Sequence, residues 1–331
     1  MVNHAGTARS ISLLLSGVLV GLCAGVFLGQ RVLGGDIAMR IEDDLVEHAK
    51  KGVYTNPLLA CGDLDSLSVG AMQTLKKTLE GIIENRRLAG HVSHVSVYVR
   101  DLNNGPWLGI NERESFYPAS LLKVPLLMAT YKAAEDRPGF MESTLTFSLS
   151  PFETVQLFPP KEKLEQGKNY TVQELLERAI VFSDNDATAL LAVAVGAEPA
   201  LEVFEDFGIA KPSPNADYQM QVRNYASFFR VLYNASYLNR THSEEALSIL
   251  ARVDFPDGLL KGVPKGVPVA HKFGEREGTI EGGDYQLHDC GIVYTNNPYL
   301  ICVMAQGKST QGMLEVIALL SKEVYETINT I

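Results

Sequence analysis

Residues 116–125 read Phe-Tyr-Pro-Ala-Ser-Leu-Leu-Lys-Val-Pro, and they place Ser120 three residues before Lys123. Residues three apart lie on one face of a helix, with Cβ atoms about 5–6 Å apart. A serine hydroxyl becomes a good nucleophile when a neighbouring base takes its proton, and a lysine among apolar neighbours loses its own proton more readily. Pro118 favours a helix that begins there, with Ser120 in its first turn. The segment therefore predicts a serine nucleophile, although a capping serine followed by a surface lysine would show the same spacing.

Two downstream segments favour the serine nucleophile over the capping serine. Ser183-Asp184-Asn185 separates two apolar helical stretches, so we expect either a polar turn that faces a cleft or a cap for the second helix. Residues 267–274, Val-Pro-Val-Ala-His-Lys-Phe-Gly, predict a strand that carries Lys272 and ends at a glycine. Class A β-lactamases and penicillin-binding proteins combine Ser-x-x-Lys, Ser-Asp-Asn and Lys-Thr-Gly, and similar motifs occur here in that order.

The chain therefore resembles the class A β-lactamase-like serine hydrolases from residue 66 to residue 331. Residues 117–123 match the nucleophile segment of that family, and residues 288–294 and 299–305 resemble its last two strands. The resemblance implies an α+β fold, in which an antiparallel sheet of about five strands is flanked by N- and C-terminal helices and carries an inserted all-helical lobe. The active site would lie between the two lobes, where binding sites are common.

The hydrophobic pattern agrees with this architecture. Apolar residues at helical spacing predict a first helix over 67–88 and a last helix over about 312–328. Residues 92–102 alternate apolar and polar side chains and are followed by Asn103-Asn104-Gly105, which predicts a hairpin with 107–110. Strands are expected again over residues 267–273, 287–294 and 299–306, and helices between residues 120 and about 236.

The resemblance also implies a role for each site residue. Ser120 would attack the carbonyl of a β-lactam or of a peptide ending in D-alanine and form an acyl-enzyme, while Lys123 would accept or relay its proton. Ser183 would pass a proton to the leaving nitrogen, with Lys272 close by. The N–H groups of Ser120 and Glu275 would form the oxyanion hole. The predicted substrate-binding residues are Asn185, Gly274 and Arg276, and structural roles are expected for Asp184, His271 and Tyr117.

Two departures from the family pattern bear on function. Phe273 stands where the family has a threonine whose hydroxyl binds the substrate carboxylate, and Arg276 is close enough in sequence to compensate. Class A β-lactamases also carry a Glu-x-x-Leu-Asn loop that supplies the base for deacylation. The corresponding stretch, 207–220, lacks that motif, and Asp217 is its only carboxylate. We therefore expect slow deacylation, as in a penicillin-binding protein or peptidase.

Two other functions fit parts of the sequence. An efficient β-lactamase is the close alternative, and a non-catalytic binding or sensor module of the cell envelope is the more distant one. The combination of Ser120, Lys123, Ser183, Asn185 and Lys272 argues against pure binding, because binding would not require all five.

Composition limits the partners and cofactors. The chain has 331 residues and a formal net charge of −10, which argues against nucleic acid as a partner because phosphates require a basic surface. No Cys/His spacing of the zinc type occurs, and we expect neither a metal nor a cofactor. Cys290 and Cys302 fall on neighbouring predicted strands, where they could meet or could simply be small buried residues.

The N-terminus predicts a membrane anchor. Residues 11–29 carry no charge, and nineteen residues of helix span about 28 Å, close to the hydrocarbon thickness of a bilayer. We therefore divide the chain into an anchor (1–33), a stalk (34–65) and a hydrolase domain (66–331). The family's substrates place that domain on the extracytoplasmic side of a single-pass protein in the cell membrane. A cleaved signal peptide would have a shorter apolar stretch and a clearer cleavage site.

Glycine recurs at every fourth residue of the predicted anchor, at Gly17, Gly21, Gly25 and Gly29. Such a stripe lets two membrane helices approach closely and pair as a homodimer. Glycine is also frequent in unpaired membrane helices, so both interpretations stay open.

Overall fold

A computed structural model of the chain describes residues 52–56, 69–103, 105–148, 156–213, 217–278 and 284–330. The predicted anchor, its glycine stripe and most of the stalk lie outside these residues. Within the described ranges no single helix is long and apolar enough to cross a membrane. Helices α5 (Asn185–Val195) and α6 (Ala197–Asp206) meet those criteria only as a pair, which is bent by 89°.

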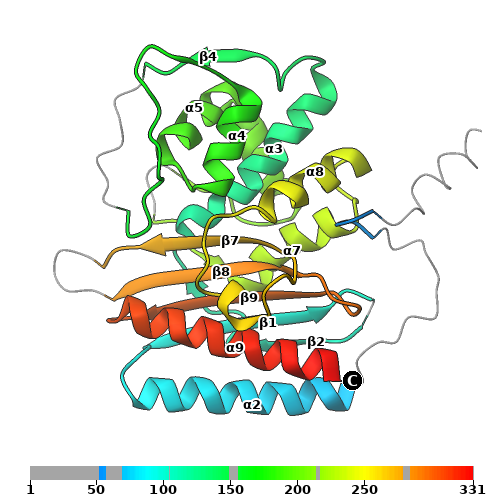
Figure 1. Ribbon diagram of the computed structural model, residues 1–331, viewed down its shortest axis with the longest axis vertical. Coiled ribbons are helices and arrows are strands. Elements are labelled where there is room, and N and C mark those ends of the chain that lie inside the picture. Colours follow the sequence, from blue (N-terminus) through cyan, green and yellow to red (C-terminus); the bar gives the residue numbers. More distant parts are fainter. Residues whose placement is uncertain are drawn as a thin grey trace, which may run out of the picture. The chain divides into compact units, whose positions relative to one another are not determined.

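A five-stranded antiparallel sheet lies at the centre of the fold, as predicted (Figure 1). The strands follow the order β2-β1-β9-β8-β7, so the N-terminal hairpin pairs with the last strand of the chain. The strands are β1 (His94–Asp101), β2 (Trp107–Ile110), β7 (Val269–Arg276), β8 (Tyr285–Val293) and β9 (Tyr299–Gly307). The central strand β9 is almost entirely buried, because both faces of the sheet are covered.

The two terminal helices of the domain cover one face of this sheet, and α7 covers the other (Figure 1). The first pair is α2 (Val69–Leu88) and α9 (Thr310–Thr330), which agree with the predicted helices to within two residues. Helix α7 (Val222–Tyr233) packs on β1, β8 and β9. This layering explains why β1 is buried on both faces, although its sequence alternates.

A helical lobe lies beside the β7 edge of the sheet (Figure 1). Besides α5 and α6 its helices are α3 (Lys123–Asp136), α4 (Val172–Val181) and α8 (Arg240–Leu250). Four short elements lie where the chain passes between the sheet and the helices: β3 (Ser115–Phe116), η1 (Ala119–Leu122), β6 (Met220–Gln221) and η2 (Leu260–Gly262). Two more, β4 (Thr144–Thr146) and β5 (Asn169–Thr171), pair with each other between α3 and α4. Thr171 and Glu174 form a capping box at the start of α4, and Asn239 caps α8 through the N–H of His242.

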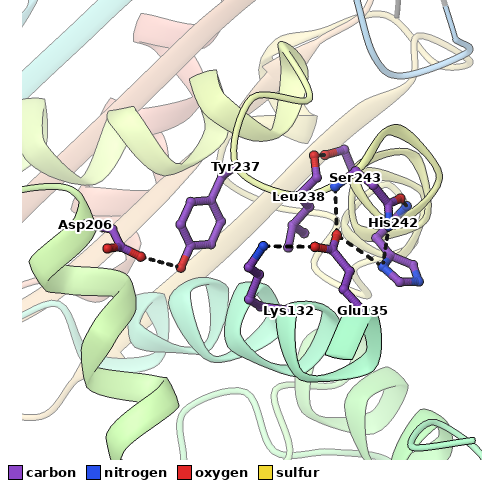
Figure 2. A network of polar contacts seen from close by, with 8 residues as sticks. Lys132, Glu135, Asp206, Tyr237, Leu238, His242 and Ser243 are labelled. Atoms are coloured by element: carbon purple, nitrogen blue, oxygen red, sulfur yellow. Dashed lines mark hydrogen bonds and ion pairs between the residues drawn. The ribbon is translucent and has the colours of Figure 1, made fainter. Parts of the chain in front are cut away.

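Glu135 joins helix α3 to the start of α8 (Figure 2). Its carboxylate accepts hydrogen bonds from Lys132 Nζ at 3.0 Å and from the Asn239 N–H at 2.7 Å, and His242 Nδ1 lies 3.4 Å away. Burial raises the pKa of Glu135, but these hydrogen bonds outweigh burial, so the pKa lies below its ordinary value. The polar network therefore stabilises the lobe while Glu135 is ionised.

Cys290 and Cys302 lie directly opposite each other on β8 and β9. Both are fully buried, and both are free thiols. Both expectations are therefore confirmed, since the two cysteines meet and are small buried residues, without a disulfide between them.

Candidate active site

The nucleophile segment is held in place by side chains of β8. Gln286 Oε1 accepts a hydrogen bond from the Tyr117 N–H at 3.0 Å, and His288 Nε2 lies 2.9 Å from the Tyr117 carbonyl oxygen. Burial lowers the pKa of His288 to about 4, so the ring is neutral at pH 7 and Nε2 carries the proton that it donates. Both contacts fix the backbone three residues before Ser120.

Ser120 lies in a 3₁₀ turn, η1, and α3 begins only at Lys123. The predicted helix that begins at Pro118, with Ser120 in its first turn, is confirmed, and its first turn is 3₁₀ rather than α. Ala119 adopts a left-handed backbone with φ of 49°, which a regular α-helix cannot include, and the chain enters α3 through the tighter turn instead. A non-glycine residue in that region costs about 1–3 kcal/mol, so the neighbouring contacts hold the turn against strain.

Gly274 lets strand β7 approach this turn. A Cβ atom on Gly274 would lie 2.8 Å from the carbonyl oxygen of Pro118 and 3.0 Å from Cγ of Leu121. From the other side, the Tyr225 hydroxyl donates a hydrogen bond to the Leu121 carbonyl at 3.1 Å. The missing side chain at Gly274 therefore sets the distance between β7 and Ser120.

Ser183 lies between the two lysines of the site. Its Oγ atom is 3.1 Å from Lys123 Nζ and 3.0 Å from Lys272 Nζ. Lys123 Nζ also donates to the Ser183 carbonyl at 2.6 Å and to Asn185 Oδ1 at 2.9 Å, and Lys272 Nζ donates to the Phe273 carbonyl at 3.0 Å. Both lysines are buried. The structure thus brings four of the predicted site residues into one hydrogen-bonded cluster.

Burial changes the protonation of this cluster. It lowers the pKa of Lys123 to about 7, although the nearby Asp184 and Glu275 carboxylates oppose the shift. It also lowers the pKa of Lys272 well below its ordinary value, and the positive charge of Lys123 adds to that effect. The predicted desolvation of Lys123 is therefore confirmed, and near pH 7 this lysine exists in both charged and neutral forms.

A cavity of about 470 Å³ opens above the cluster. Four predicted site residues line it, namely Ser120, Asn185, Glu275 and Arg276, together with Ala119, Gln156, Leu157 and Glu277. The hydrogen bonds of Lys123 Nζ go to Ser183 and Asn185 rather than to the Ser120 hydroxyl. Catalytic hydrogen bonds are often unformed in an empty site and tighten when substrate binds. A substrate in this cavity can therefore contact Ser120, while Lys123 and Lys272 are buried behind the cavity wall.

The Ser183 turn combines both predicted features, since it faces the cavity and it caps a helix. Ser183 has φ of 55°, and the carboxylate of Asp184 accepts hydrogen bonds from the N–H groups of Asp186 and Ala187 at the start of α5. Gln156 Nε2 donates to the Ser183 carbonyl at 3.1 Å. Asp184 is therefore a structural residue of the turn, and Gln156 is a site residue that sequence reasoning missed.

Within the described ranges, no group of three or more His, Cys, Asp or Glu side chains could hold a metal ion. The buried His271 lies with Nδ1 2.9 Å from Asp289 Oδ1, and Asp289 Oδ2 accepts a hydrogen bond from the Leu259 N–H. This pair connects β7, β8 and the loop before η2, which agrees with the structural role expected for His271.

Comparison with known proteins agrees with this geometry. A family model described as the beta-lactamase enzyme family matches residues 74–328. The chain belongs to this family. It is 25% identical over 299 residues to the extended-spectrum β-lactamase PER-1 of Pseudomonas aeruginosa, an alignment that covers 83% of this chain and 94% of that protein. The β-lactamase VEB-1 of the same species is 23% identical over 68% of the chain and 82% of its own length.

Solved structures of the family share the fold. A point mutant of PBP-A, solved as its acyl-enzyme complex with penicillin G, matches with a TM-score of 0.64 and 22% identity, over 78% of this chain and 98% of that one. The extended-spectrum β-lactamase TLA-3 matches with a TM-score of 0.68 and 18% identity, over 78% and 99%. Membership of the β-lactamase family makes this protein a serine hydrolase that acts on amide bonds.

Phe273, the departure from the family's third motif, is buried in an aromatic cluster. Its ring stacks on Phe255 with centroids 4.2 Å apart, meets Phe158 edge-on at 5.8 Å, and lies 4.0 Å from Lys272 Nζ. It has no group that could hydrogen-bond a carboxylate. The guanidinium of Arg276 lies over the Tyr117 ring at 3.6 Å, at the cavity wall, which leaves it available to an anionic substrate group.

The carboxylate of the loop that departs from the β-lactamase pattern contacts Tyr117 and does not line the cavity. Asp217 accepts a hydrogen bond from the Tyr117 hydroxyl at 3.1 Å, and it is absent from the cavity lining. Glu275 is the nearer carboxylate, and burial raises its pKa. Its Oε1 atom accepts a hydrogen bond from the Phe158 N–H at 3.2 Å, so it contacts the same segment as Gln156.

Proposed function

We propose that this protein is acylated at Ser120 by β-lactams or by peptides ending in D-Ala-D-Ala, and that the acyl-enzyme is released slowly. The single observation that carries the proposal is the position of Ser183 Oγ, which lies within hydrogen-bonding distance of both buried lysines below the Ser120 cavity. A hydroxyl between two lysines can receive a proton from one side and pass one to a leaving group on the other.

In the proposed acylation, Ser120 Oγ attacks the carbonyl carbon while Lys123, in its neutral form, accepts the serine proton. The resulting oxyanion would be stabilised by the N–H groups of Ser120 and Glu275. Ser183 then donates its proton to the leaving nitrogen as the C–N bond breaks, and it recovers a proton from Lys123. The pKa of about 7 supports the role of Lys123, because the neutral base is present near physiological pH.

Substrate binding is proposed for Asn185, Gly274 and Arg276. The first and last line the cavity, and Gly274 acts through the close packing that it permits. We propose that Arg276 binds the carboxylate of the substrate in place of the family's threonine. A β-lactam as substrate is supported by the names of the relatives, and a penicillin-G acyl-enzyme is known for the related PBP-A mutant.

Slow deacylation is supported by the positions of the carboxylates. A deacylation base must lie within hydrogen-bonding reach of a water beside the acyl carbon. Asp217 is engaged with Tyr117, and Glu275 is engaged with the loop at Phe158. Glu275 Oε2, which has no hydrogen-bond partner among the described residues, and Glu277, which lines the cavity, are the carboxylates left for a water to use. The proposal of slow deacylation therefore rests on the absence of the Glu-x-x-Leu-Asn motif from the loop, whose one carboxylate, Asp217, contacts Tyr117 instead.

We also propose that residues 1–33 anchor the protein in the cell membrane, that residues 34–65 act as a stalk, and that the hydrolase domain, 66–331, faces the extracytoplasmic side. The uncharged stretch 11–29 supports the anchor. Pairing of two anchors through the glycine stripe is the corresponding proposal for a homodimer.

A fluorescent penicillin tests acylation directly. The wild-type protein should become covalently labelled, Ser120→Ala should not, and Ser143→Ala should be labelled normally, because Ser143 is exposed and lies outside the cavity. Failure of the wild type to label, with a labelled penicillin-binding protein as positive control, would contradict the proposal.

Rapid nitrocefin turnover that Ser120→Ala loses would favour the efficient β-lactamase. Binding of peptidoglycan fragments by Ser120→Ala as tightly as by the wild type, without hydrolysis by either, would favour the binding module.

A further inference from the structure

A second cavity, of about 220 Å³, lies between α7 and the β1–β2 end of the sheet, at the opposite edge from β7. Its wall contains three arginines, Arg100, Arg223 and Arg230, and the aromatic residue Trp107. Among the described lining residues there is no carboxylate. None of the described residues that line it also lines the cavity at Ser120.

The arginines converge from two elements. Arg100 on β1 lies directly opposite Trp107 on β2. Arg223 and Arg230 are seven residues apart on α7, which places them two turns apart on one face of the helix. The guanidinium of Arg223 lies 5.0 Å from the centre of the Trp107 ring, and the other ring neighbour, Tyr98, stacks at 5.6 Å.

These three guanidinium groups form no ion pair or hydrogen bond within the described part of the chain. Other arginines do pair with carboxylates, at N–O distances of 2.8 to 3.9 Å. These pairs are Arg86–Glu315, Arg87–Glu84, Arg113–Glu112, Arg178–Glu162 and Arg252–Glu177. In a chain with a net charge of −10, carboxylates are plentiful, so three arginines around one cavity without such a partner are unusual.

The helix itself adds to the positive potential. The first turn of α7 contains Arg223 and no acidic residue, and no side chain caps it. Unpaired N–H groups and the positive end of the helix dipole disfavour an arginine there and favour an anion. Asn224, which also belongs to this first turn, lines the cavity as well. An anionic ligand would offset the repulsion among all these groups.

We propose that this cavity binds a small phosphate ester whose ring packs on Trp107. Guanidinium groups bind phosphate oxygens in a bidentate manner, and a dianionic phosphate offers three terminal oxygens to three arginines. Trp107 is 42% accessible although Arg223 and Tyr98 lie against its ring, so the part of the indole that they leave exposed can contact a flat or sugar ring. Since a molecule of liquid water occupies about 30 Å³, a cavity of about 220 Å³ has room for about seven waters. This volume accommodates a phosphate group and part of a ring.

The test uses the intrinsic fluorescence of Trp107, which is the only tryptophan in the chain. The full-length protein is titrated with inorganic phosphate, N-acetylglucosamine 1-phosphate and adenosine monophosphate, each up to about 10 mM. We expect at least one ring-bearing probe to give a saturable change at lower concentration than inorganic phosphate. Tighter binding of N-acetylglucosamine 1-phosphate would indicate a sugar phosphate as the ligand, and tighter binding of adenosine monophosphate would indicate a nucleotide.

Substitutions test whether the change in Trp107 fluorescence comes from binding in this cavity. Arg223→Gln and Arg230→Gln should each weaken binding about tenfold or more, since each loses a charge-assisted hydrogen bond to the phosphate. Arg113→Gln, which removes an exposed charge outside the cavity, should bind like the wild type, and so should Ser120→Ala. The proposal is overturned if no probe changes the fluorescence, if inorganic phosphate binds as tightly as both ring-bearing probes, or if Arg223→Gln and Arg230→Gln bind as the wild type does. These results are independent of acylation at Ser120.

Discussion

Replacing Ser183 with alanine removes an oxygen atom that both buried lysines contact, at 3.1 Å from Lys123 and 3.0 Å from Lys272. A hydrogen bond to a charged group contributes about 1.5–3 kcal/mol, and this range applies to each contact when its lysine is protonated in the transition state. If both act in the transition state of acylation, their loss costs about 3–6 kcal/mol, or about two to four powers of ten in rate. General acid–base catalysis by one side chain typically contributes a factor of about 10²–10⁴, which is the same range.

A second substitution separates chemistry from stability. Ser183 has φ of 55°, which glycine adopts without strain. Ser183→Gly therefore loses the same hydroxyl but relieves about 1 kcal/mol or more of backbone strain, whereas Ser183→Ala keeps that strain. We expect Ser183→Gly to unfold at a higher temperature than Ser183→Ala, while both are acylated equally slowly.

The assay measures the second-order rate of labelling by a fluorescent penicillin, with circular dichroism to follow thermal unfolding. Acylation of either variant at a rate within a few-fold of the wild type would refute a proton-transfer role for Ser183. Acylation rates that follow thermal stability, with Ser183→Gly much faster than Ser183→Ala, would show that the turn matters only for its backbone.

Lys123, Gly274 and Glu135 each carry a further prediction. Because the pKa of Lys123 is about 7 and its neutral form is the base, the acylation rate should fall about tenfold per pH unit below that value, and a flat profile from about pH 5 to 9 would contradict this. Gly274→Ala places a Cβ atom 2.8 Å from the Pro118 carbonyl, so it should lower both the acylation rate and the unfolding temperature. Gly81→Ala, in the interior of α2 with open space around its Cβ, should leave the acylation rate unchanged and should raise the unfolding temperature slightly, because alanine favours a helix by about 0.5–1 kcal/mol over glycine. Glu135→Gln should lower the free energy of unfolding by about 1 kcal/mol at pH 7. Because the folded-state pKa of Glu135 is lowered, the stabilisation by its carboxylate is complete above the ordinary pKa of 4.5 and is lost as the pH falls through the folded-state pKa. The unfolding temperatures of the variant and the wild type should therefore converge in acid.

The sequence predicted the sheet and the four clustered residues because each motif has a local signature. Lys272 lies on a β-branched strand, and Ser183 lies in a polar turn between two apolar helices. The strands at both ends of the domain can pair only if the chain between them forms a separate lobe. That topology brings together the motifs at Ser120, Ser183 and Lys272. The sequence therefore predicted a single site from the presence of these motifs in the family's order.

The remaining features depend on contacts between distant residues. Gln286 and His288 hold the backbone of Tyr117 from 169 and 171 residues away, and no local pattern marks either as a support for the nucleophile. Ala119 has a left-handed backbone that its residue type disfavours, so the sequence predicted the helix but not this residue's conformation within it. The apolar–polar alternation of residues 92–102 did not reveal that both faces of β1 are covered. Ser96 is buried there, and its hydroxyl is satisfied by donating a hydrogen bond to the Asn111 carbonyl at 2.7 Å.

The central claim, that Ser120 is readily acylated and slowly released, is tested most directly by intact-protein mass spectrometry after a brief exposure to penicillin G. Excess β-lactam is removed, and the acylated fraction is then followed over time. We predict that nearly all of the wild-type protein carries the adduct, that the adduct persists much longer than its formation takes, and that Ser120→Ala carries none. Disappearance of the adduct as fast as it forms, with continuous consumption of penicillin, would contradict the account.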